Sequence, residues 1–227
     1  LYQFLTFTKY VDRKKYIPLR HEADYCLDMI RKIGIQVQSI LPEIHLTDAE
    51  KNKAKAFRKK HLRINQKLIG INISSGNSAP NLNQGEYKKL ISLLNKNSNY
   101  KVAIMDNNLS ADLDNIDDVI YPNKGNALRE SIINLASLDL LISNSTGPMH
   151  ICAALNVPTV SLFCPLNACS PKLWGPLGNK SKIIMPTQNY CDTQCPIDPK
   201  KCDYSKEGGL TAAEVAEKVD QFLNKIQ

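Results

Sequence analysis

Apolar runs of strand length alternate with segments of helical periodicity along most of this chain. Residues 67–73 (KLIGINI) are almost continuously apolar, the pattern of a strand buried on both faces. Residues 86–97 instead place Leu90, Leu93 and Leu94 on one side of a helix. The same reasoning predicts strands at 100–105, 118–121, 138–143, 158–163 and 182–185, and helices at 47–62, 126–137, 148–155 and 211–226.

Three of these helices have more specific signals. Thr47-Asp-Ala-Glu50 is a capping box, in which the threonine and glutamate side chains bond each other's backbone N–H groups. Residues 126–137 space Leu128, Ile132 and Leu135 for one buried face, and residues 211–226 do the same with Val215, Val219 and Leu223.

Strands that alternate with helices, and that are too apolar to face water, predict a parallel sheet covered on both faces. The expected fold class is α/β, with a Rossmann-like doubly wound sheet over residues 41–210 and a C-terminal helix over 211–227. Residues 1–40 stand apart, with a strand over 2–10 and an amphipathic helix over 21–33, and are interpreted as the tail of a preceding domain. Residues 164–210 are rich in Pro, Asn and Cys and predict long ordered loops.

The net charge of +7 favours acidic partners. Basic residues are densest over Lys51–Lys67, which contains no acidic residue. A solvated helix face is one interpretation of this segment, and contact with an anionic membrane surface is the other. Nucleic acid is not an expected partner, because few aromatic residues accompany the basic ones and no nucleic-acid motif is present. No apolar run approaches the roughly 20 residues that a membrane-spanning helix needs, and no signal peptide is recognisable.

The seven cysteines are odd in number and widely scattered, which does not fit a secreted disulfide framework and favours the reducing cytoplasm. Cys191, Cys195 and Cys202 are clustered. As a metal site they are weak candidates, because their spacing is loose for zinc and a fourth ligand, such as Asp192 or Asp203, would be needed. A loop thiol cluster or a single disulfide is the alternative.

The segment 144–155 (NSTGPMHICAAL) carries the strongest chemical signal. The strand before it ends where ligands bind in open parallel sheets, outside the carboxyl ends of the strands. Pro148 suits the first helical position, so that Thr146 and Gly147 would form the cap and expose N–H groups to an anion such as phosphate. His150 would face the same anion. The alternative is a plain strand–turn–helix with a capping threonine.

A second polar loop, with Ser74, Ser75 and Gly76, follows the strand at 67–73 and is expected at the same edge of the sheet. Two such loops at one crevice favour a nucleotide or a nucleotide sugar. Two other residues have open interpretations: Met149 contacts the nucleotide or fills the core, and Trp174 lines the cleft or anchors a loop. Asp139 is expected to pair locally.

At this point the sequence resembles a known family. LISNSTGPMHICAALNVPTVSLFCP, followed by GPLG, resembles the C-terminal domain of the ADP-heptose:lipopolysaccharide heptosyltransferases, glycosyltransferase family 9. HEADYCLDMIRKIGI resembles the segment between that family's two domains, and KLIGINISSG resembles the first strand and loop of its donor domain. CDTQC and the later LTAAEV resemble its cysteine-bearing tail. The resemblance covers nearly the whole chain.

The resemblance implies a two-domain enzyme of the GT-B type, of which this chain is the C-terminal, donor-binding half. It implies inverting, metal-independent transfer of a heptose from ADP-heptose to a lipopolysaccharide core acceptor, without a cofactor, in the cytoplasm or at the inner face of the inner membrane. The catalytic base is expected in the N-terminal domain, so that this chain alone should bind the donor without turnover. The residues implied at the donor are Ser145, Thr146, Gly147, Met149 and His150 near the diphosphate, Ser74, Ser75 and Gly76 along the pocket, and Asn126, Ala127 and Leu128 near the adenine.

Two departures from the family pattern leave alternatives open. Ser145 stands where the family has an aspartate, and residues 79–82 (APNL) lack the family's basic residue, so Lys88 or Lys172 would have to supply a positive charge. A diverged nucleotide-sugar-binding protein without catalysis is therefore the second hypothesis. A metal-binding or interaction module built on the clustered cysteines is the third.

Overall fold

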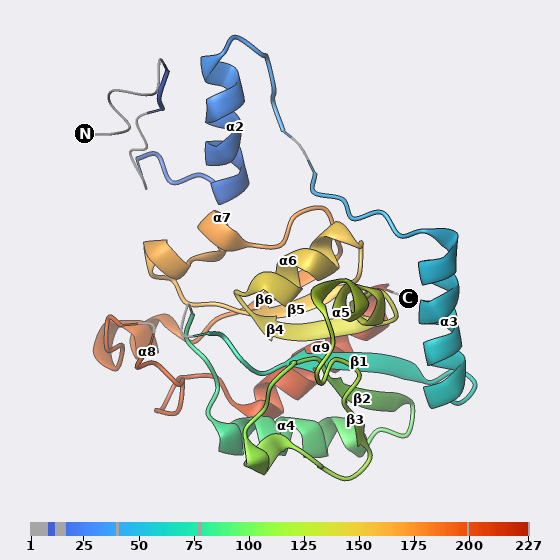
Figure 1. Ribbon diagram of the computed structural model, residues 1–227. Coiled ribbons are helices and arrows are strands. Elements are labelled where there is room, and N and C mark those ends of the chain that lie inside the picture. The colour runs from blue at the N-terminus through green and yellow to red at the C-terminus, as the bar shows by residue number, and fades with distance from the viewer. Residues whose placement is uncertain (1–8, 12–16, 40, 77–78, 199, 227) are drawn as a thin grey trace.

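The computed structural model describes residues 9–11, 17–39, 41–76, 79–198 and 200–226. Its centre is a six-stranded parallel sheet with the strand order β3-β2-β1-β4-β5-β6 (Figure 1). In this Rossmann order the sheet grows outward in opposite directions from β1 and β4, which creates a crevice between their carboxyl ends. The strands are β1 (Lys67–Asn72), β2 (Tyr100–Ile104), β3 (Val119–Ile120), β4 (Leu140–Asn144), β5 (Thr159–Leu162) and β6 (Ser181–Ile184).

Helices cover both faces of the sheet, as the near-continuous apolar strands require. One face carries α4 and α9, and the other carries α3, α5 and α6 (Figure 1). The helices are α2 (Glu22–Lys32), α3 (Asp48–His61), α4 (Gln84–Asn95), α5 (Leu128–Leu135), α6 (Gly147–Ala154), α7 (Pro171–Trp174), α8 (Gln188–Thr193) and α9 (Ala212–Ile226), with 3-10 turns η1 (Ala111–Leu113) and η2 (Asn167–Cys169).

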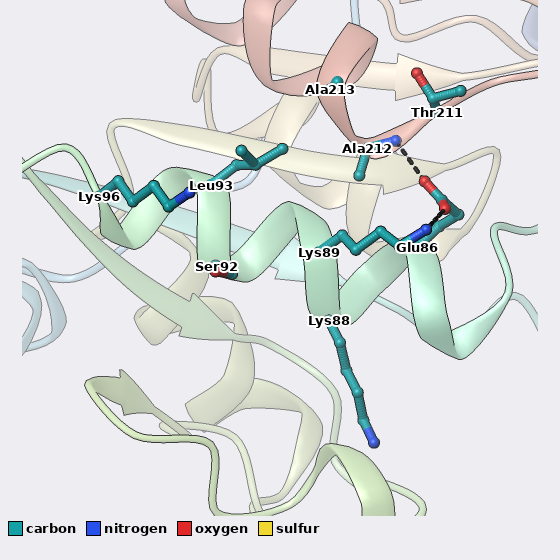
Figure 2. Close-up of a pocket in the computed structure, with 9 residues that line it drawn as sticks. All are labelled: Glu86, Lys88, Lys89, Ser92, Leu93, Lys96, Thr211, Ala212 and Ala213. Carbon is teal, nitrogen blue, oxygen red and sulfur yellow. Dashed lines mark hydrogen bonds and ion pairs between the residues drawn. The ribbon is translucent and has the colours of Figure 1, made fainter.

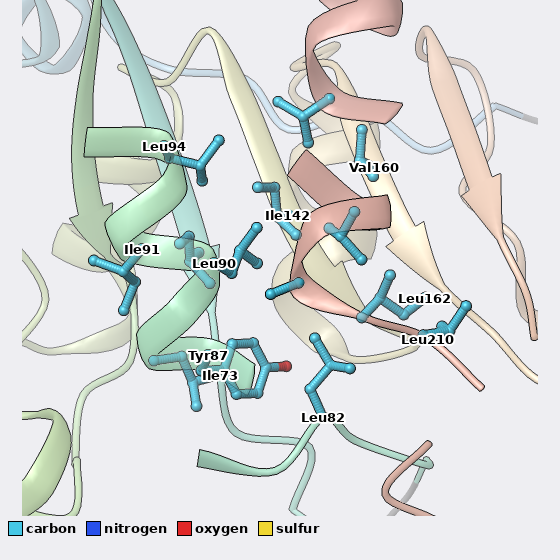
Figure 3. Close-up of a cluster of buried hydrophobic side chains, with 14 of the residues drawn as sticks. Ile73, Leu82, Tyr87, Leu90, Ile91, Leu94, Ile142, Val160, Leu162 and Leu210 are labelled. Carbon is cyan, nitrogen blue, oxygen red and sulfur yellow. The ribbon is translucent and has the colours of Figure 1, made fainter. Parts of the chain in front are cut away.

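The larger core lies between the sheet and the pair α4 and α9. Figure 3 shows Leu90 and Leu94 of α4 on the face of the sheet from which Ile142 of β4 projects. Val215 and Val219 of α9 complete this core and are fully buried, as their spacing predicts. Each fully buried Leu or Ile side chain stabilises the fold by about 1.5–3 kcal/mol. This layer therefore fixes α4 and α9 against the sheet.

The opposite face buries alternate strand residues, including Leu68 and Leu141, against Cys152 of α6. Asp139 lies at the amino end of this layer, where its carboxylate accepts from the Leu68 N–H at 2.7 Å and pairs with Arg58 of α3 at 2.8 Å. Asp139 was expected to pair locally, but both of these partners are distant in the sequence, on α3 and β1.

The predicted strands and helices are found with small shifts at their ends. The capping box of α3 is confirmed, with the Glu50 N–H donating to Thr47 Oγ1 at 3.3 Å and the Thr47 N–H donating to Glu50 Oε2 at 2.8 Å. The amphipathic helix predicted at 21–33 is α2. Most of the strand predicted over 2–10 lies outside the described residues.

Two further predictions were wrong. The first concerns α5, where Leu128 is 70% exposed and the buried residues are Ile133 and Leu135. Leu128 is the first residue of the helix, and only the later part of α5 packs against the sheet. The second concerns residues 164–210, where the helices α7 and α8 and the turn η2 interrupt the predicted loops. The strand predicted at 182–185 within this range is found as β6.

No helix in the described part of the chain is long and apolar enough to cross a membrane. The division of the chain into segments 1–40, 41–210 and 211–227 stays a prediction.

Candidate functional site

A pocket of about 320 Å³ opens at the carboxyl edge of the sheet, where β4 leads into α6. This is the position expected for a ligand in a doubly wound sheet. It is lined by Ala79, Ser145, Thr146, Gly147, His150, Ala168, Cys169 and Trp174.

The start of α6 forms one wall of the pocket. Thr146 is the N-cap, but its side chain makes no capping bond and instead donates to Asn72 Oδ1 at 2.9 Å. The plain capping role is therefore contradicted. The helix begins at Gly147, so Pro148 is its second residue and not, as the sequence predicted, its first.

Donors at this helix start are open. Within the described part of the chain, the N–H groups of Thr146 and Gly147 have no acceptor. A Cβ built on Gly147 would meet no atom of the described residues within 4 Å, so they leave the space above this residue free. Open N–H groups at the positive end of a helix, beside free space, can bind an anion such as phosphate.

A buried carboxylate organises the neighbouring loop. Asp106, which follows β2 and is 3% exposed, accepts from the Ile73 N–H at 2.7 Å and from the Ser74 N–H at 2.8 Å. It also accepts from Asn72 Nδ2 at 2.9 Å. These bonds saturate the first N–H groups of the loop after β1, so they are not available to a ligand. Asn72 thereby connects Asp106 to Thr146 across two strands.

A second buried network joins the same loop to α4 and β4. The Tyr87 hydroxyl donates to Asn81 Oδ1 at 2.6 Å, and Asn81 Nδ2 donates to the Ile73 carbonyl at 2.7 Å. The amide of Asn144, fully buried, donates to both Asn81 Oδ1 and the Tyr87 hydroxyl. Burial holds the pKa of Tyr87 well above its usual value, so its hydroxyl stays protonated and the network persists at neutral pH.

His150 is the titratable base that lines the pocket. Burial, and secondarily the nearby His21, lower the pKa of His150, which favours the neutral ring. His21 caps α2, where its Nδ1 accepts from the Ala23 N–H at 3.1 Å. Because Nδ1 accepts, Nε2 carries the proton and donates to the Gly175 carbonyl at 2.8 Å. This bond attaches α2 to the loop after α7, beside the pocket (Figure 1).

Several residues expected at the donor are found together. Ser145, Thr146, Gly147 and His150 line one pocket. Trp174 has both of its proposed roles, because it lines the pocket and its Nε1 donates to the Ala168 carbonyl at 3.0 Å.

Other expected donor residues lie elsewhere. Met149 is fully buried in α6 and does not line the pocket, which matches its packing interpretation. The loop that contains Ser74, Ser75 and Gly76 runs along the same sheet edge, and of its described residues Ala79 lines the pocket, whereas Ser74, Ser75 and Gly76 do not.

The segment proposed near the adenine begins farther along the sheet edge. Asn126, Ala127 and Leu128 precede and open α5, and the Asn126 carbonyl accepts from Asn107 Nδ2 at 2.9 Å. They do not line the pocket.

The lysines proposed to supply positive charge are not at the pocket. Figure 2 shows Lys88 on α4, in a groove of about 590 Å³ beside the start of α9. There the Glu86 carboxylate accepts from the Ala212 N–H at 2.7 Å, which satisfies a backbone donor at the start of α9. The same carboxylate pairs with Lys89 at 2.7 Å. Lys172 lies on α7 and is exposed. Among the described residues that line the pocket there is no Lys, Arg, Asp or Glu.

The sequence analysis did not identify the side chains that form the hydrogen-bond networks beside the pocket, namely Asn72, Asn81, Tyr87, Asp106 and Asn144. The signal was the polar side chain at the end of an otherwise apolar run, in KLIGIN for Asn72 and after YKVAIM for Asp106.

The cysteines are all free thiols. In the described ranges, no group of three or more His, Cys, Asp or Glu side chains is placed to hold a metal ion. The metal interpretation of Cys191, Cys195 and Cys202 therefore has no support from their geometry.

Comparisons with known proteins place these features in context. A family profile described as "Glycosyltransferase family 9 (heptosyltransferase)" matches residues 14–201. A Haemophilus influenzae protein provisionally named a glycosyltransferase is 26% identical over 179 residues, which are 73% of this chain and 52% of that protein. The chain thus spans about half the length of this curated relative.

Solved structures share the fold. A glycosyl transferase family 9 protein from Veillonella parvula aligns with a TM-score of 0.71 at 21% identity, over 96% of this chain and 63% of that one. The ADP-heptose lps heptosyltransferase II of E. coli aligns with a TM-score of 0.58 at 19% identity, over 85% of this chain and 56% of that one.

Proposed function

The chain belongs to glycosyltransferase family 9 (heptosyltransferase), and from this premise we propose that it binds the nucleotide-sugar donor of a sugar transfer. The supporting observation is the pocket at the start of α6. There the open N–H groups of Thr146 and Gly147 and the His150 ring can bind a diphosphate. The same groups would stabilise the diphosphate as it leaves the sugar and gains charge.

The finer assignment of the donor is ADP-heptose, with a lipopolysaccharide core as acceptor. It is supported by the family and by the E. coli fold relative, whose name states that donor and lipopolysaccharide. We propose inverting transfer to an acceptor hydroxyl without a metal ion or cofactor. We propose that the catalytic base lies outside this site, a proposal that is supported by the lack of a carboxylate among the described residues of the pocket.

The second candidate function is nucleotide-sugar binding without catalysis. It is favoured by the absence of Lys and Arg among the described pocket residues and by Ser145 at the position of the family's aspartate. Nucleotide affinity in a full-length protein that transfers no sugar would distinguish it from the transferase.

The deciding experiment is calorimetric titration of the chain with ADP, UDP and ADP-heptose. We expect micromolar binding of ADP, weaker binding of UDP, and loss of ADP binding in His150→Ala and Thr146→Val. Ser205→Ala, remote on the loop before α9, is the control and should bind ADP as the unaltered chain does. Absence of binding for all three ligands, in a folded chain, would refute the donor-site proposal.

We further propose that the protein acts in the cytoplasm, at the inner face of the inner membrane. The supporting surface is α3 and its C-terminal extension, where exposed basic residues lie along the helix and Ile64, just beyond its end, is 92% exposed. Anionic lipid attracts each such basic residue by about 1 kcal/mol near the surface. The exposed basic residues are Lys51, Lys53, Lys55, Lys59, Lys60 and Arg63.

Sedimentation with vesicles tests this surface. Binding to phosphatidylglycerol vesicles should weaken in Lys59→Glu/Lys60→Glu and with added salt, and should persist in the control Lys200→Glu/Lys201→Glu. Equal binding of both double variants would contradict the proposal.

A further inference from the structure

One residue of α2 reaches the loop that forms a wall of the candidate pocket. His21, the N-cap of α2, donates from Nε2 to the carbonyl of the buried Gly175 at 2.8 Å. Gly175 directly follows Trp174, which lines the pocket. Figure 1 shows α2 beside α7, the short helix that ends at Trp174. The bond therefore connects a segment that precedes the sheet in the sequence to a side chain at the site.

The loop around Trp174 is tied together by its own hydrogen bonds. Trp174 Nε1 donates to the Ala168 carbonyl at 3.0 Å, and the Trp174 backbone N–H donates to the Ser170 carbonyl at 3.0 Å. The Gly175 N–H donates to the Pro171 carbonyl at 2.7 Å, and a Cβ built on Gly175 would lie 2.5 Å from that oxygen. This close approach leaves the backbone of Gly175 little freedom to move relative to α7. A displacement of the Gly175 carbonyl would therefore carry the indole ring with it.

The two ring nitrogens of His21 have separate partners. Nδ1 accepts from the Ala23 N–H at 3.1 Å and so caps α2, whereas Nε2 makes the bond to Gly175. The capping bond stabilises the helix to which His21 belongs, and the bond to Gly175 acts on the pocket wall. The ring is also close enough to His150 to lower the pKa of His150, second to burial. A plain cap would need only the first bond, since serine, asparagine or aspartate is a favoured N-cap.

We propose that His21 is a positioning residue for the donor pocket, which acts through the Gly175 carbonyl to hold Trp174 in the pocket wall. The inference rests on the proposed function where it concerns the nucleotide, but the position of Trp174 can be measured without a ligand. Farther along the loop, a Cβ built on Gly178 would lie 3.6 Å from Leu41 Cδ2, so a second contact remains when the His21 bond is lost. The expected effect is therefore partial, a roughly fivefold loss of ADP affinity, which corresponds to one net hydrogen bond.

Two substitutions separate the capping bond from the bond to Gly175. Asparagine places its amide where Nδ1 stands and is a favoured N-cap, so His21→Asn keeps the cap and loses the bond to Gly175. Glutamine places its amide near the position of Nε2 and is not a favoured N-cap, so His21→Gln can donate to Gly175 but caps α2 poorly. His45→Asn is the matched control, because His45 also precedes α3 and its side chain is 89% exposed.

The fluorescence of Trp174, the single tryptophan of the chain, tests the proposal without a ligand. Acrylamide should quench this fluorescence more strongly in His21→Asn than in the unaltered chain, because the indole ring is held less firmly in the wall. Calorimetry should show that ADP binds His21→Asn roughly fivefold more weakly. His21→Gln and His45→Asn should match the unaltered chain in both measurements. Circular dichroism verifies that each variant is folded.

The outcomes distinguish this inference from the proposed function. Equal quenching of Trp174 in folded His21→Asn and His45→Asn would overturn the inference. Equal changes in His21→Asn and His21→Gln would also overturn it, because His21 would then act only as a cap. Unchanged ADP affinity in His21→Asn would show that the pocket does not need this bond, and the inference would fail. If the unaltered chain binds no ADP while quenching rises in His21→Asn, the donor-site proposal fails and the role of His21 in holding Trp174 stands.

Discussion

The hydroxyl of Thr146 donates to the side-chain oxygen of Asn72, 2.9 Å away, instead of capping its own helix α6. Asn72 is the last residue of β1, and Ser143 of β4 is its partner in the sheet. The bond therefore turns a local capping residue into a contact across the crevice. The N–H groups of Thr146 and Gly147 are open for a separate reason, because the first N–H groups of a helix have no intrahelical acceptor.

The open space above Gly147 predicts a specific loss of nucleotide binding in Gly147→Ala. The added methyl group meets no atom within 4 Å in the described part of the chain, so the fold should be retained, with stability unchanged or raised by up to about 1 kcal/mol. The methyl group would fill the site of the anion, and ADP affinity should fall at least about tenfold. Calorimetry and thermal melting measure the two effects. Gly85→Ala, in the first turn of α4, is the control for ADP binding, which it should leave unchanged. Its stability can fall, because the added Cβ would lie 3.2 Å from Asn83 Oδ1. Unchanged affinity in Gly147→Ala would place the anion elsewhere.

The three donors around Asp106 predict a large stability loss in Asp106→Asn. An amide presents its own N–H groups to backbone N–H groups and leaves at least one buried donor unsatisfied, at a cost of about 3 kcal/mol. Urea unfolding measures this change. Asp112→Asn, at an exposed position in η1, should change stability by less than about 0.5 kcal/mol. Equal midpoints for the two variants would contradict the role assigned to Asp106.

The network around Tyr87 predicts that Tyr87→Phe costs about 2 kcal/mol, because it removes a hydrogen-bond partner of the part-buried amide of Asn81 and of the fully buried amide of Asn144. Tyr100→Phe is the control, since it removes one bond to Asp220 at the surface and should cost less than about 1 kcal/mol. The urea unfolding midpoints of the two variants measure these stability losses. A larger loss of stability in Tyr100→Phe than in Tyr87→Phe would contradict the prediction.

The environment of His150 predicts a pH dependence of stability. Because burial lowers the pKa of His150 in the folded chain, the unfolded chain binds more protons between the two pKa values. The stability associated with neutral His150 is complete above the ordinary histidine pKa and is lost as the pH falls from there to the folded-state pKa. Melting temperatures between pH 7.5 and 5 should therefore fall less steeply in His150→Gln.

His61 on α3 is the matched comparison for this prediction, because burial also lowers its pKa. Its variant His61→Gln should reduce the same slope without affecting ADP binding, whereas His150→Gln should affect both. If the melting temperatures of His150→Gln and the unaltered chain fall equally steeply between pH 7.5 and 5, the His150 ring does not titrate in the expected range.

Much of the candidate site could be predicted from local patterns. Thr146, Gly147 and His150 come together because they are consecutive or one helical turn apart, so a strand followed by a helix is enough to place them. The error of one residue at Pro148 is of the size expected where a helix end is set by contacts rather than by residue preference. Met149 shares the same turn, but its burial depends on which side of α6 meets the sheet.

The sequence by itself determined the order of strands and helices, the two-sided covering of the sheet and the turn at Asn144–Gly147, because hydrophobic period and capping residues act over a few positions. Only the tertiary structure decided that Asp106 saturates the loop after β1, that Asn72 holds Thr146, and that Lys88 lies outside the pocket. Each of these depends on which strands are neighbours and in what register. That arrangement is set by packing across the whole sheet, where the polar side chains at the strand ends have to find partners once water is excluded.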